Sequence, residues 1–227
     1  MVFWIASLAG LALAYLIGAM PTGYLAGKWL KGLDIREHGS GSTGATNVLR
    51  TLGKGPAAVV LLVDLLKGAA AILLVRAAYP WLWAWPAVTP PAAADPQAWT
   101  PWAVAVAGLA VLLGHARPVW LNFAGGKSAA TGLGVLLAMS WPVGLGAAAV
   151  FGAVLAVSRI VSLSSMLGAL AAIALVCGLP QPLPYRLLVI AGGLYVILRH
   201  RANIRRLLAR TEPRLGQRGP PSAGSET

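Results

Sequence analysis

The chain carries little charge for its length. Only 11% of its 227 residues are charged, whereas a soluble domain has about 25%. Hydrophobic residues make up 58%, and they form long apolar runs such as the one from Val2 to Met20. A helix needs roughly 20 such residues to cross a hydrocarbon layer of about 30 Å. The shortage of charge therefore excludes an ordinary soluble domain and predicts an all-α, polytopic membrane protein.

Cysteine is nearly absent as well. The single cysteine, Cys177, lies in an apolar run and has no partner for an internal disulfide or a cysteine-based metal site. We expect it to be a small core hydrophobe. No motif in the sequence calls for a metal or a cofactor, so neither is expected.

The charge that is present is basic and unevenly placed. The net charge is +12, which in a soluble protein would suggest nucleic acid, but here its distribution matters more. Seven spans are predicted, at about 2–25, 57–78, 101–115, 128–141, 143–158, 162–178 and 185–199. Lys and Arg occur in the connections 26–56 and 116–127, at Arg159 and in the tail after Leu198, but not in 79–100, near Pro142 or in Gly178–Pro184. The positive-inside rule then places the N-terminus outside and the C-terminus in the cytoplasm. Because this distribution of charge is that of a membrane protein, no nucleic-acid partner is expected.

We predict one transmembrane domain, 1–216, followed by a Gly/Pro/Ser-rich tail, 217–227, that is expected to be disordered. The segment 128–158 has about 30 residues for two spans around Ser140-Trp141-Pro142. Because each would be short, tilted, half-depth and re-entrant helices all remain open there.

A glycine-rich segment lies in the first basic connection. It runs Gly39-Ser40-Gly41-Ser42-Thr43-Gly44-Ala45-Thr46-Asn47 and is followed by Arg50. Glycines allow backbone N–H groups to turn toward an anion, hydroxyls add donors, and a helix start near Thr43 would favour negative charge. The segment also matches G-x-G-x-x-G, but a dinucleotide fold needs a preceding strand. A phosphate site is therefore predicted, with a flexible glycine loop as the alternative.

A second segment runs from Gly114-His115 to Gly125-Gly126-Lys127, just before an apolar helix. Two glycines permit close backbone approach to a phosphate and Lys127 adds a point charge. It is not a P-loop, because Leu121 stands where that motif needs glycine. The alternative is a tight turn at the membrane surface with a positive-inside lysine.

Two further polar segments fall on the same predicted side. The hydroxyls of Ser162, Ser164 and Ser165 open a helix and could simply cap it. His200 and Asn203 are three residues apart and share a helix face, within a tail that could also be a basic helix on anionic lipid headgroups.

Asp64 and Lys67 are the charged pair predicted to lie within a span. Charged groups inside a membrane indicate function by default, but the i, i+3 spacing permits mutual pairing and hence a structural role.

In this order, the four polar segments, with Glu212 after the last, resemble those of the bacterial membrane glycerol-3-phosphate acyltransferases that use acyl-phosphate, the PlsY type. The resemblance covers residues 5–216. It implies seven transmembrane helices and a cytoplasmic active site. It further implies transfer of an acyl chain to the sn-1 hydroxyl of glycerol 3-phosphate, giving lysophosphatidic acid and phosphate. The family usually has Asn-Pro or Asn-Ile where Ser42-Thr43 stand here, and commonly Gly in place of Ser128.

The resemblance implies that the loop carrying Lys127 holds glycerol 3-phosphate and that Glu212 supports the fold. Whether His200 acts as a general base or orients a phosphate stays open. Candidate catalytic residues are Ser40, His200 and Asn203. Candidate substrate-binding residues are Gly39, Gly41, Gly44, Thr46, Asn47, Arg50, His115, Gly125, Gly126, Lys127, Ser164 and Ser165.

The expected partners are acyl-phosphate, glycerol 3-phosphate and the lipids of a bacterial plasma membrane, and the sequence does not indicate an oligomeric state. Acyltransferases with a His-x-x-x-x-Asp dyad are disfavoured because no histidine here has Asp five residues later. An anion transporter would need its polarity near the midplane, where only Asp64 and Lys67 qualify. A non-enzymatic scaffold would leave the four polar segments unexplained.

Overall fold

The computed structural model describes residues 1–86, 88 and 95–216, and those residues form helices and loops without a strand. The predicted disordered tail, 217–227, lies outside the described residues. The α-helices are α1 (Val2–Ala19), α2 (Thr22–Lys31), α3 (Ala45–Leu52), α4 (Lys54–Ala84), α5 (Pro96–Ala116), α6 (Ala129–Met139), α7 (Trp141–Ser158), α8 (Val161–Gly178), α9 (Leu183–Arg199) and α10 (Arg201–Leu208). Two 3₁₀ turns, η1 (Ile35–Glu37) and η2 (Val119–Leu121), lie in the loops.

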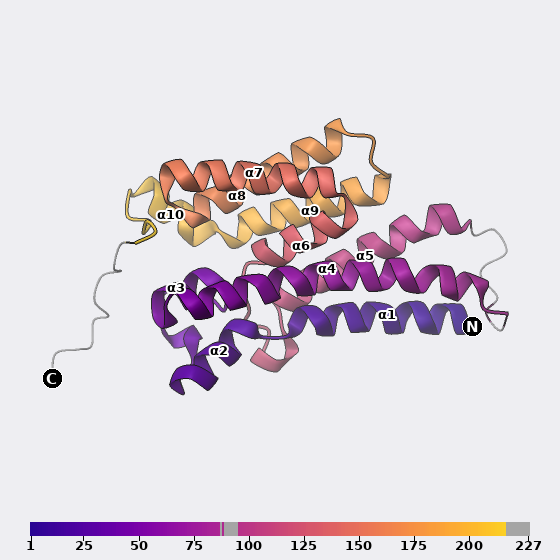
Figure 1. The fold of residues 1–227 in the computed structure, drawn as a ribbon, viewed down its shortest axis with the longest axis horizontal. Helices are drawn as coiled ribbons and strands as arrows, with labels where there is room; N and C mark the ends of the chain where they lie inside the picture. The colour runs from indigo at the N-terminus through magenta and orange to yellow at the C-terminus, as the bar shows by residue number, and fades with distance from the viewer. Residues whose placement is uncertain (87, 89–94, 217–227) are drawn as a thin grey trace.

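The helices form two groups that run lengthwise (Figure 1). One group contains α1, α4 and α5, the other contains α7, α8 and α9, and α6 packs against both α4 and α7. The N-terminus of α1 lies at one end of the bundle. The short helices α2, α3 and α10 lie at the other end (Figure 1).

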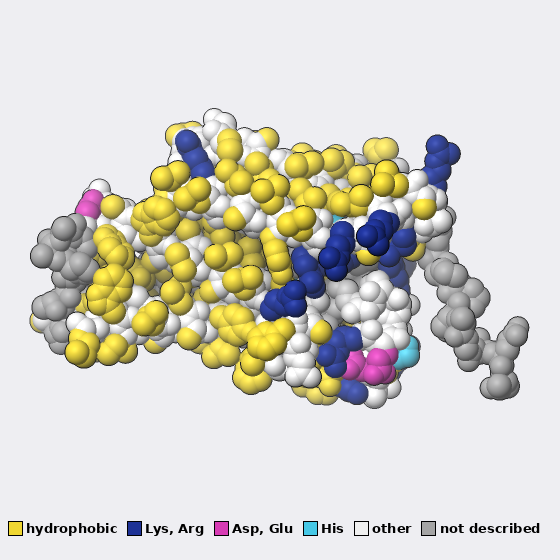
Figure 2. Space-filling view, turned by 180° about the vertical axis from the view of Figure 1, so that it is seen from behind, with side chains coloured by type: hydrophobic (Ala, Val, Ile, Leu, Met, Phe, Trp, Pro, Cys, Tyr) yellow, Lys and Arg dark blue, Asp and Glu magenta, His cyan; other side chains and the backbone are white. Residues whose placement is uncertain are grey.

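The surface of the bundle suits a lipid environment. Large apolar side chains of α4 such as Leu62 and Leu73 are more than half exposed. Figure 2 shows apolar side chains over most of one face, while most of the Lys and Arg side chains gather at one end. Exposing such a large apolar surface to water would be unfavourable, whereas its contact with hydrocarbon is not. The chain is therefore a multi-pass membrane protein, as predicted.

The number of crossings differs in detail from the prediction. Among the described residues, five segments are long and apolar enough to span: Val2–Lys31, Lys54–Ala84, Pro96–Leu121, Trp141–Ser158 and Val161–Gly178. The pair α9 and α10, bent by 56° at His200, can supply a sixth. Helix α6 has 11 residues, which reach about 16 Å and cover half a bilayer. In 128–158 the structure has a short α6, and its depth and tilt in the membrane stay predictions. Seven crossings and the orientation of the termini remain predictions.

The C-terminal end of α6 is stabilised by an arginine from another helix. The Arg76 guanidinium of α4 donates a hydrogen bond of 2.7 Å to the carbonyl oxygen of Ala138. The last carbonyls of a helix have no intrahelical donor and carry partial negative charge, so a cation there is favourable. Arg76 lies inside a predicted span, so the pattern of charge in the connections between spans predicted no role for it.

Candidate active site

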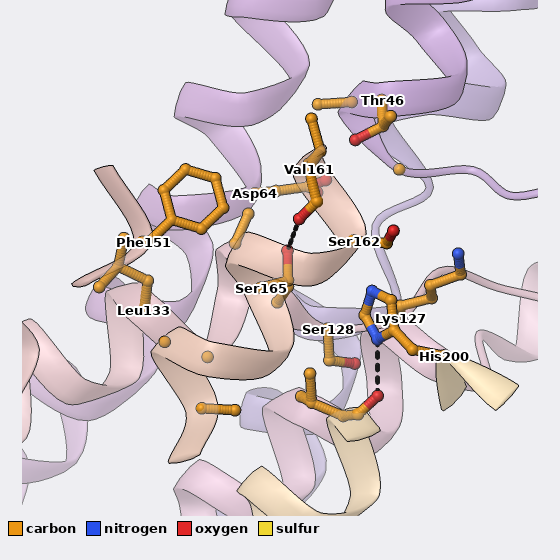
Figure 3. A pocket seen from close by; sticks show the side chains of 18 of the residues that line it. Thr46, Asp64, Lys127, Ser128, Leu133, Phe151, Val161, Ser162, Ser165 and His200 are labelled. Atoms are coloured by element: carbon orange, nitrogen blue, oxygen red, sulfur yellow. Dashed lines mark hydrogen bonds between the residues drawn. The ribbon is translucent and has the colours of Figure 1, made fainter. Parts of the chain in front are cut away.

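A cavity of about 310 Å³ lies where the glycine-rich loops meet α8, α9 and α10. Figure 3 shows Lys127 and His200 together on one side of the view, and Leu133 and Phe151 on the other. The polar lining of the cavity consists of Ser40, Ser42, Thr46, Asn47, Arg50, Asp64, His115, Lys127, Ser128, Ser162, Ser165, His200, Asn203 and Glu212. The remaining wall is apolar and comes mainly from α6, α7, α8 and α9.

The first predicted phosphate segment is a loop held by one side chain. The Asn47 amide nitrogen donates to the carbonyl oxygens of Ile35, His38 and Ser42 at 2.9 to 3.0 Å, and its oxygen accepts from the Ser40 N–H at 2.8 Å. Gly39 has a φ of +60°, and a Cβ there would collide with the Asn47 oxygen. Asn47 was predicted to bind substrate, but its amide is already used to fix the loop.

The predicted residues of this segment divide into two sets. Ser40, Gly44, Thr46 and Asn47 line the cavity, whereas Gly39 and Gly41 do not. Arg50 also lines it, and its guanidinium forms no hydrogen bond or ion pair with the residues that the structure describes. Arg50 is thus a cation available to a ligand.

The second predicted phosphate segment is built differently from the expectation. The N–H groups of Gly125 and Gly126 donate to the carbonyl oxygens of Ala116 and His115, each at 3.2 Å. The Arg199 guanidinium in turn donates to both glycine carbonyls, at 3.3 and 3.0 Å. Neither glycine lines the cavity. The prediction that these N–H groups face a phosphate is therefore not what the structure shows.

The glycine at position 126 is instead required by a close approach within the protein. A Cβ on Gly126 would fall on the Nε2 atom of the His115 ring. His115 itself lines the cavity, so the loop is folded back on the end of α5 and presents the next residue, Lys127, to the cavity.

Lys127 begins a chain of hydrogen bonds that reaches the C-terminal segment. Its Nζ donates to the Asn203 oxygen at 2.6 Å, and the Asn203 amide donates to Glu212 at 2.6 Å. Glu212 also accepts from Ser162 at 2.7 Å and from Arg206 at 2.6 Å. This network brings the second, third and fourth predicted segments together.

The electrostatics of the network follow from burial and from these partners. Burial, with nearby arginines, lowers the pKa of Lys127 to about 8, although Glu212 opposes the shift. Burial alone would raise the pKa of Glu212, but its three hydrogen-bond donors outweigh that effect, and the pKa lies below its usual value. Glu212 is therefore a buried, ionised anchor, in line with a role in supporting the fold.

His200 has one nitrogen engaged and one free to act. Its Nδ1 lies 2.7 Å from the Val196 carbonyl oxygen, and a carbonyl can only accept. The hydrogen of the neutral ring is therefore on Nδ1, which leaves a lone pair on Nε2. His200 is 4% exposed and lines the cavity.

The serine hydroxyls at the start of α8 do not cap the helix. Ser164 and Ser165 donate to the carbonyls four residues earlier, at 2.8 and 2.9 Å, and no side chain caps α8 at Ile160. Ser165 lines the cavity, whereas Ser164 does not. Ser162, which the sequence analysis noted but did not place in the site, is the one that contacts Glu212.

Sequence reasoning missed the roles of two arginines. Arg199 and Arg206 appeared only as members of a basic tail, although one holds the glycine loop and the other holds Glu212. The predicted pairing of Asp64 with Lys67 is confirmed at 2.8 Å. Within the described residues, no group of three or more His, Cys, Asp or Glu side chains is placed to hold a metal.

Comparisons with known proteins identify the family of the chain. A family model described as glycerol-3-phosphate acyltransferase matches residues 8–210. This chain belongs to the glycerol-3-phosphate acyltransferase family. It is 73% identical over 217 residues to glycerol-3-phosphate acyltransferase 2 of Rhizobium johnstonii, covering 96% of this chain and 99% of that protein. It is 58% identical over 210 residues to the glycerol-3-phosphate acyltransferase of Trichormus variabilis, covering 92% of each.

Solved structures show the same relationship. A crystal structure of PlsY (YgiH), an integral membrane glycerol 3-phosphate acyltransferase, in its glycerol 3-phosphate form matches with a TM-score of 0.80 and 35% identity. The match covers 93% of this chain and 96% of that one. The chain is therefore a PlsY-type enzyme, and the family assignment made from its four segments is confirmed.

Proposed function

We propose that the enzyme transfers a fatty acyl group from acyl-phosphate to the sn-1 hydroxyl of glycerol 3-phosphate. The products are lysophosphatidic acid and inorganic phosphate. The reaction takes place at the cytoplasmic face of a bacterial plasma membrane and supplies phospholipid synthesis. Solved structures of PlsY in glycerol 3-phosphate and lysophosphatidic acid forms support the substrate and product.

The observation that carries the proposal is the division of one cavity into a cationic end and an apolar end. Lys127 lies at the first, with Arg50 close enough to act on its charge, while Leu133 and Phe151 lie at the second (Figure 3). A substrate that joins a phosphate to an alkyl chain requires both surfaces in one site. Coenzyme A would require a further site for its nucleotide, and an acyl-phosphate does not.

The chemistry needs positioning and charge stabilisation more than a covalent intermediate, because an acyl-phosphate is a mixed anhydride with a good leaving group. The hydroxyl oxygen attacks the acyl carbon, the new ester bond forms, and the bond from that carbon to the phosphate oxygen breaks. The hydroxyl proton ends on the released phosphate. The Nε2 lone pair of His200 can accept the hydroxyl hydrogen bond on the way.

We assign one of the two substrate phosphates to each of the two cations, Lys127 and Arg50. We assign the phosphate of glycerol 3-phosphate to Lys127, with Asn203 holding the ammonium group. We assign the phosphate of the donor to Arg50 and the Ser40–Thr46 loop at the start of α3. The N-terminus of a helix and a forked guanidinium both favour a phosphate that gains charge as it leaves.

The test is phosphate release by the purified protein in detergent, given palmitoyl phosphate with and without glycerol 3-phosphate. Release should depend on glycerol 3-phosphate, and palmitoyl-coenzyme A should not replace the acyl-phosphate. In Lys127→Ala we expect kcat/KM for glycerol 3-phosphate to fall about 10- to 100-fold, which is the loss of one charge-assisted hydrogen bond. Lys54→Ala, an exposed lysine that does not line the cavity, is the matched control. Release that is independent of glycerol 3-phosphate would refute the proposal.

The cytoplasmic placement has a separate test. In a Cys177→Ser background, a membrane-impermeant maleimide applied to intact cells should label Asp95→Cys but not Lys54→Cys. The reverse pattern would overturn the proposed orientation.

A further inference from the structure

The Asp64 carboxylate in α4 is the centre of a buried cluster that the reaction does not use directly. Its side chain is 1% exposed. The Oδ1 atom accepts from the Thr22 hydroxyl at 2.6 Å and lies 2.8 Å from the Lys67 ammonium. Lys67 also donates to the Met20 carbonyl at 3.0 Å, at the break between α1 and α2. The cluster therefore joins the α1–α2 break to α4.

The same carboxylate oxygen also faces the ring of His115 at the end of α5. The distance from Asp64 Oδ1 to His115 Nδ1 is 3.6 Å. The opposite edge of this ring, at Nε2, lies where a Cβ of Gly126 would fall, and the His115 carbonyl accepts the Gly126 N–H. The imidazole thus fills the gap between the carboxylate and the loop that presents Lys127.

We infer that Asp64 is a positioning residue for Lys127: through the ring of His115, it fixes the backbone of the Gly126–Lys127 loop and so sets where the ammonium group meets the phosphate of glycerol 3-phosphate. This inference rests on the proposed role of Lys127. Asp64 also lines the cavity, but an anionic carboxylate already satisfied by Thr22 and Lys67 is not a ligand for an anionic phosphate.

A purely structural role for the pair can be separated from positioning by replacing both charges together. Removing one member of a buried ion pair leaves an uncompensated charge, whereas replacing the pair by apolar residues of similar size is often tolerated. The variant Asp64→Leu/Lys67→Met therefore removes the contact with His115 without leaving a buried charge. His115→Leu removes the intermediary itself, and thermal unfolding in detergent checks that each variant is folded.

The readout is the dissociation constant of glycerol 3-phosphate by calorimetry, which needs no acyl donor. We expect it to rise about tenfold in the pair replacement and in His115→Leu, because a misplaced ammonium loses part of a charge-assisted hydrogen bond. The combined variant carries Asp64→Leu, Lys67→Met and His115→Leu. If Asp64 acts through His115, its dissociation constant should again rise about tenfold, and not by the product of the two separate effects. Thr22→Val, which removes a hydrogen bond to the same oxygen but leaves the ring, should stay within twofold.

A folded pair replacement that binds within twofold of the parent protein would overturn the inference. So would effects that multiply to about a hundredfold, or a Thr22→Val shift as large as that of the pair. Should the pair replacement not fold, Gly126→Ala tests the same contact, since its Cβ displaces the ring, and unchanged binding there would also overturn it. Lys127→Ala separates the two proposals. If it binds normally, the proposed role of Lys127 fails. If only Lys127→Ala loses affinity, the positioning role alone fails.

Discussion

If Lys127 binds glycerol 3-phosphate as proposed, its depressed pKa predicts that the affinity for this substrate depends on pH. Its pKa of about 8 results first from burial, and then from the positive charges of Arg206, Arg50 and Arg199, with Glu212 acting in the opposite direction. His200 faces the same ammonium group. As the pH rises through 8, Lys127 loses its proton and the site loses a positive charge. Binding of a phosphate should therefore weaken toward alkaline pH.

The expected size follows from the fraction of Lys127 that is protonated. If only the ammonium form binds, the dissociation constant scales with one plus the ratio of neutral to charged lysine. Between pH 7.5 and 9.5 this factor rises about 25-fold for a pKa of about 8. The substrate contributes little to the change, because a phosphate monoester with a second pKa near 6 is already a dianion over this range.

The assay is calorimetric titration of the detergent-solubilised enzyme with glycerol 3-phosphate at four pH values from 7.5 to 9.5. Lys127→Arg is the matched control, since a guanidinium stays charged throughout and its affinity should be flat, whatever its absolute value. An unchanged affinity in the parent protein, or the same alkaline loss in Lys127→Arg, would show that Lys127 is not the titrating group.

Four substitutions at three positions test the supporting structure. Ser128 has a φ of +60° and its hydroxyl donates a hydrogen bond to the Leu112 carbonyl. Ser128→Gly removes about 1 kcal/mol of backbone strain and also removes a hydrogen bond of about the same energy. The two effects should cancel, so the unfolding midpoint should stay nearly unchanged. Ser128→Ala loses the bond without relief and should cost about 1 to 3 kcal/mol. Glu212→Gln weakens a buried acceptor of three donors and should cost about 3 kcal/mol and most activity. Arg76→Met should lower the detergent unfolding midpoint by an amount equivalent to about 1 kcal/mol, with glycerol 3-phosphate affinity unchanged, because it removes only the contact at the end of α6.

The sequence predicted three of the polar side chains that meet at the cavity. Lys127, His200 and Asn203 stand out because a lysine after two glycines, and a histidine and an amide on one helix face, are unusual at the end of apolar spans. Their convergence on one cavity is seen in the structure. Asp64 and Lys67 were recognisable as a pair because the i, i+3 rule is local.

What the sequence did not predict depends on contacts between distant segments. The glycines before Lys127 have the signature of a phosphate loop, yet their N–H groups pair with the backbone at the end of α5. Nothing within the loop distinguishes these two uses, because both require the same absence of a side chain. Arg199 lies more than 70 residues from the loop it holds, and its role is hidden among the other arginines of the tail.

Under the proposed function, the short α6 explains how one cavity serves both a phosphate and an alkyl chain. A full-length helix at this position would carry side chains through the whole layer between α4 and α7. Helix α6 ends at Met139 after 11 residues, Arg76 donates a hydrogen bond to its last turn, and α7 begins at Trp141. Leu133 and Leu136 of α6 then face the same apolar wall as Phe151 of α7. Leu136 follows Lys127 by nine positions, so the segment that holds the polar group also builds the apolar end of the cavity. An acyl chain can then remain within the lipid layer while its reacting carbon sits at the charged end, which is the geometry that transfer between a lipid-soluble donor and a water-soluble acceptor requires.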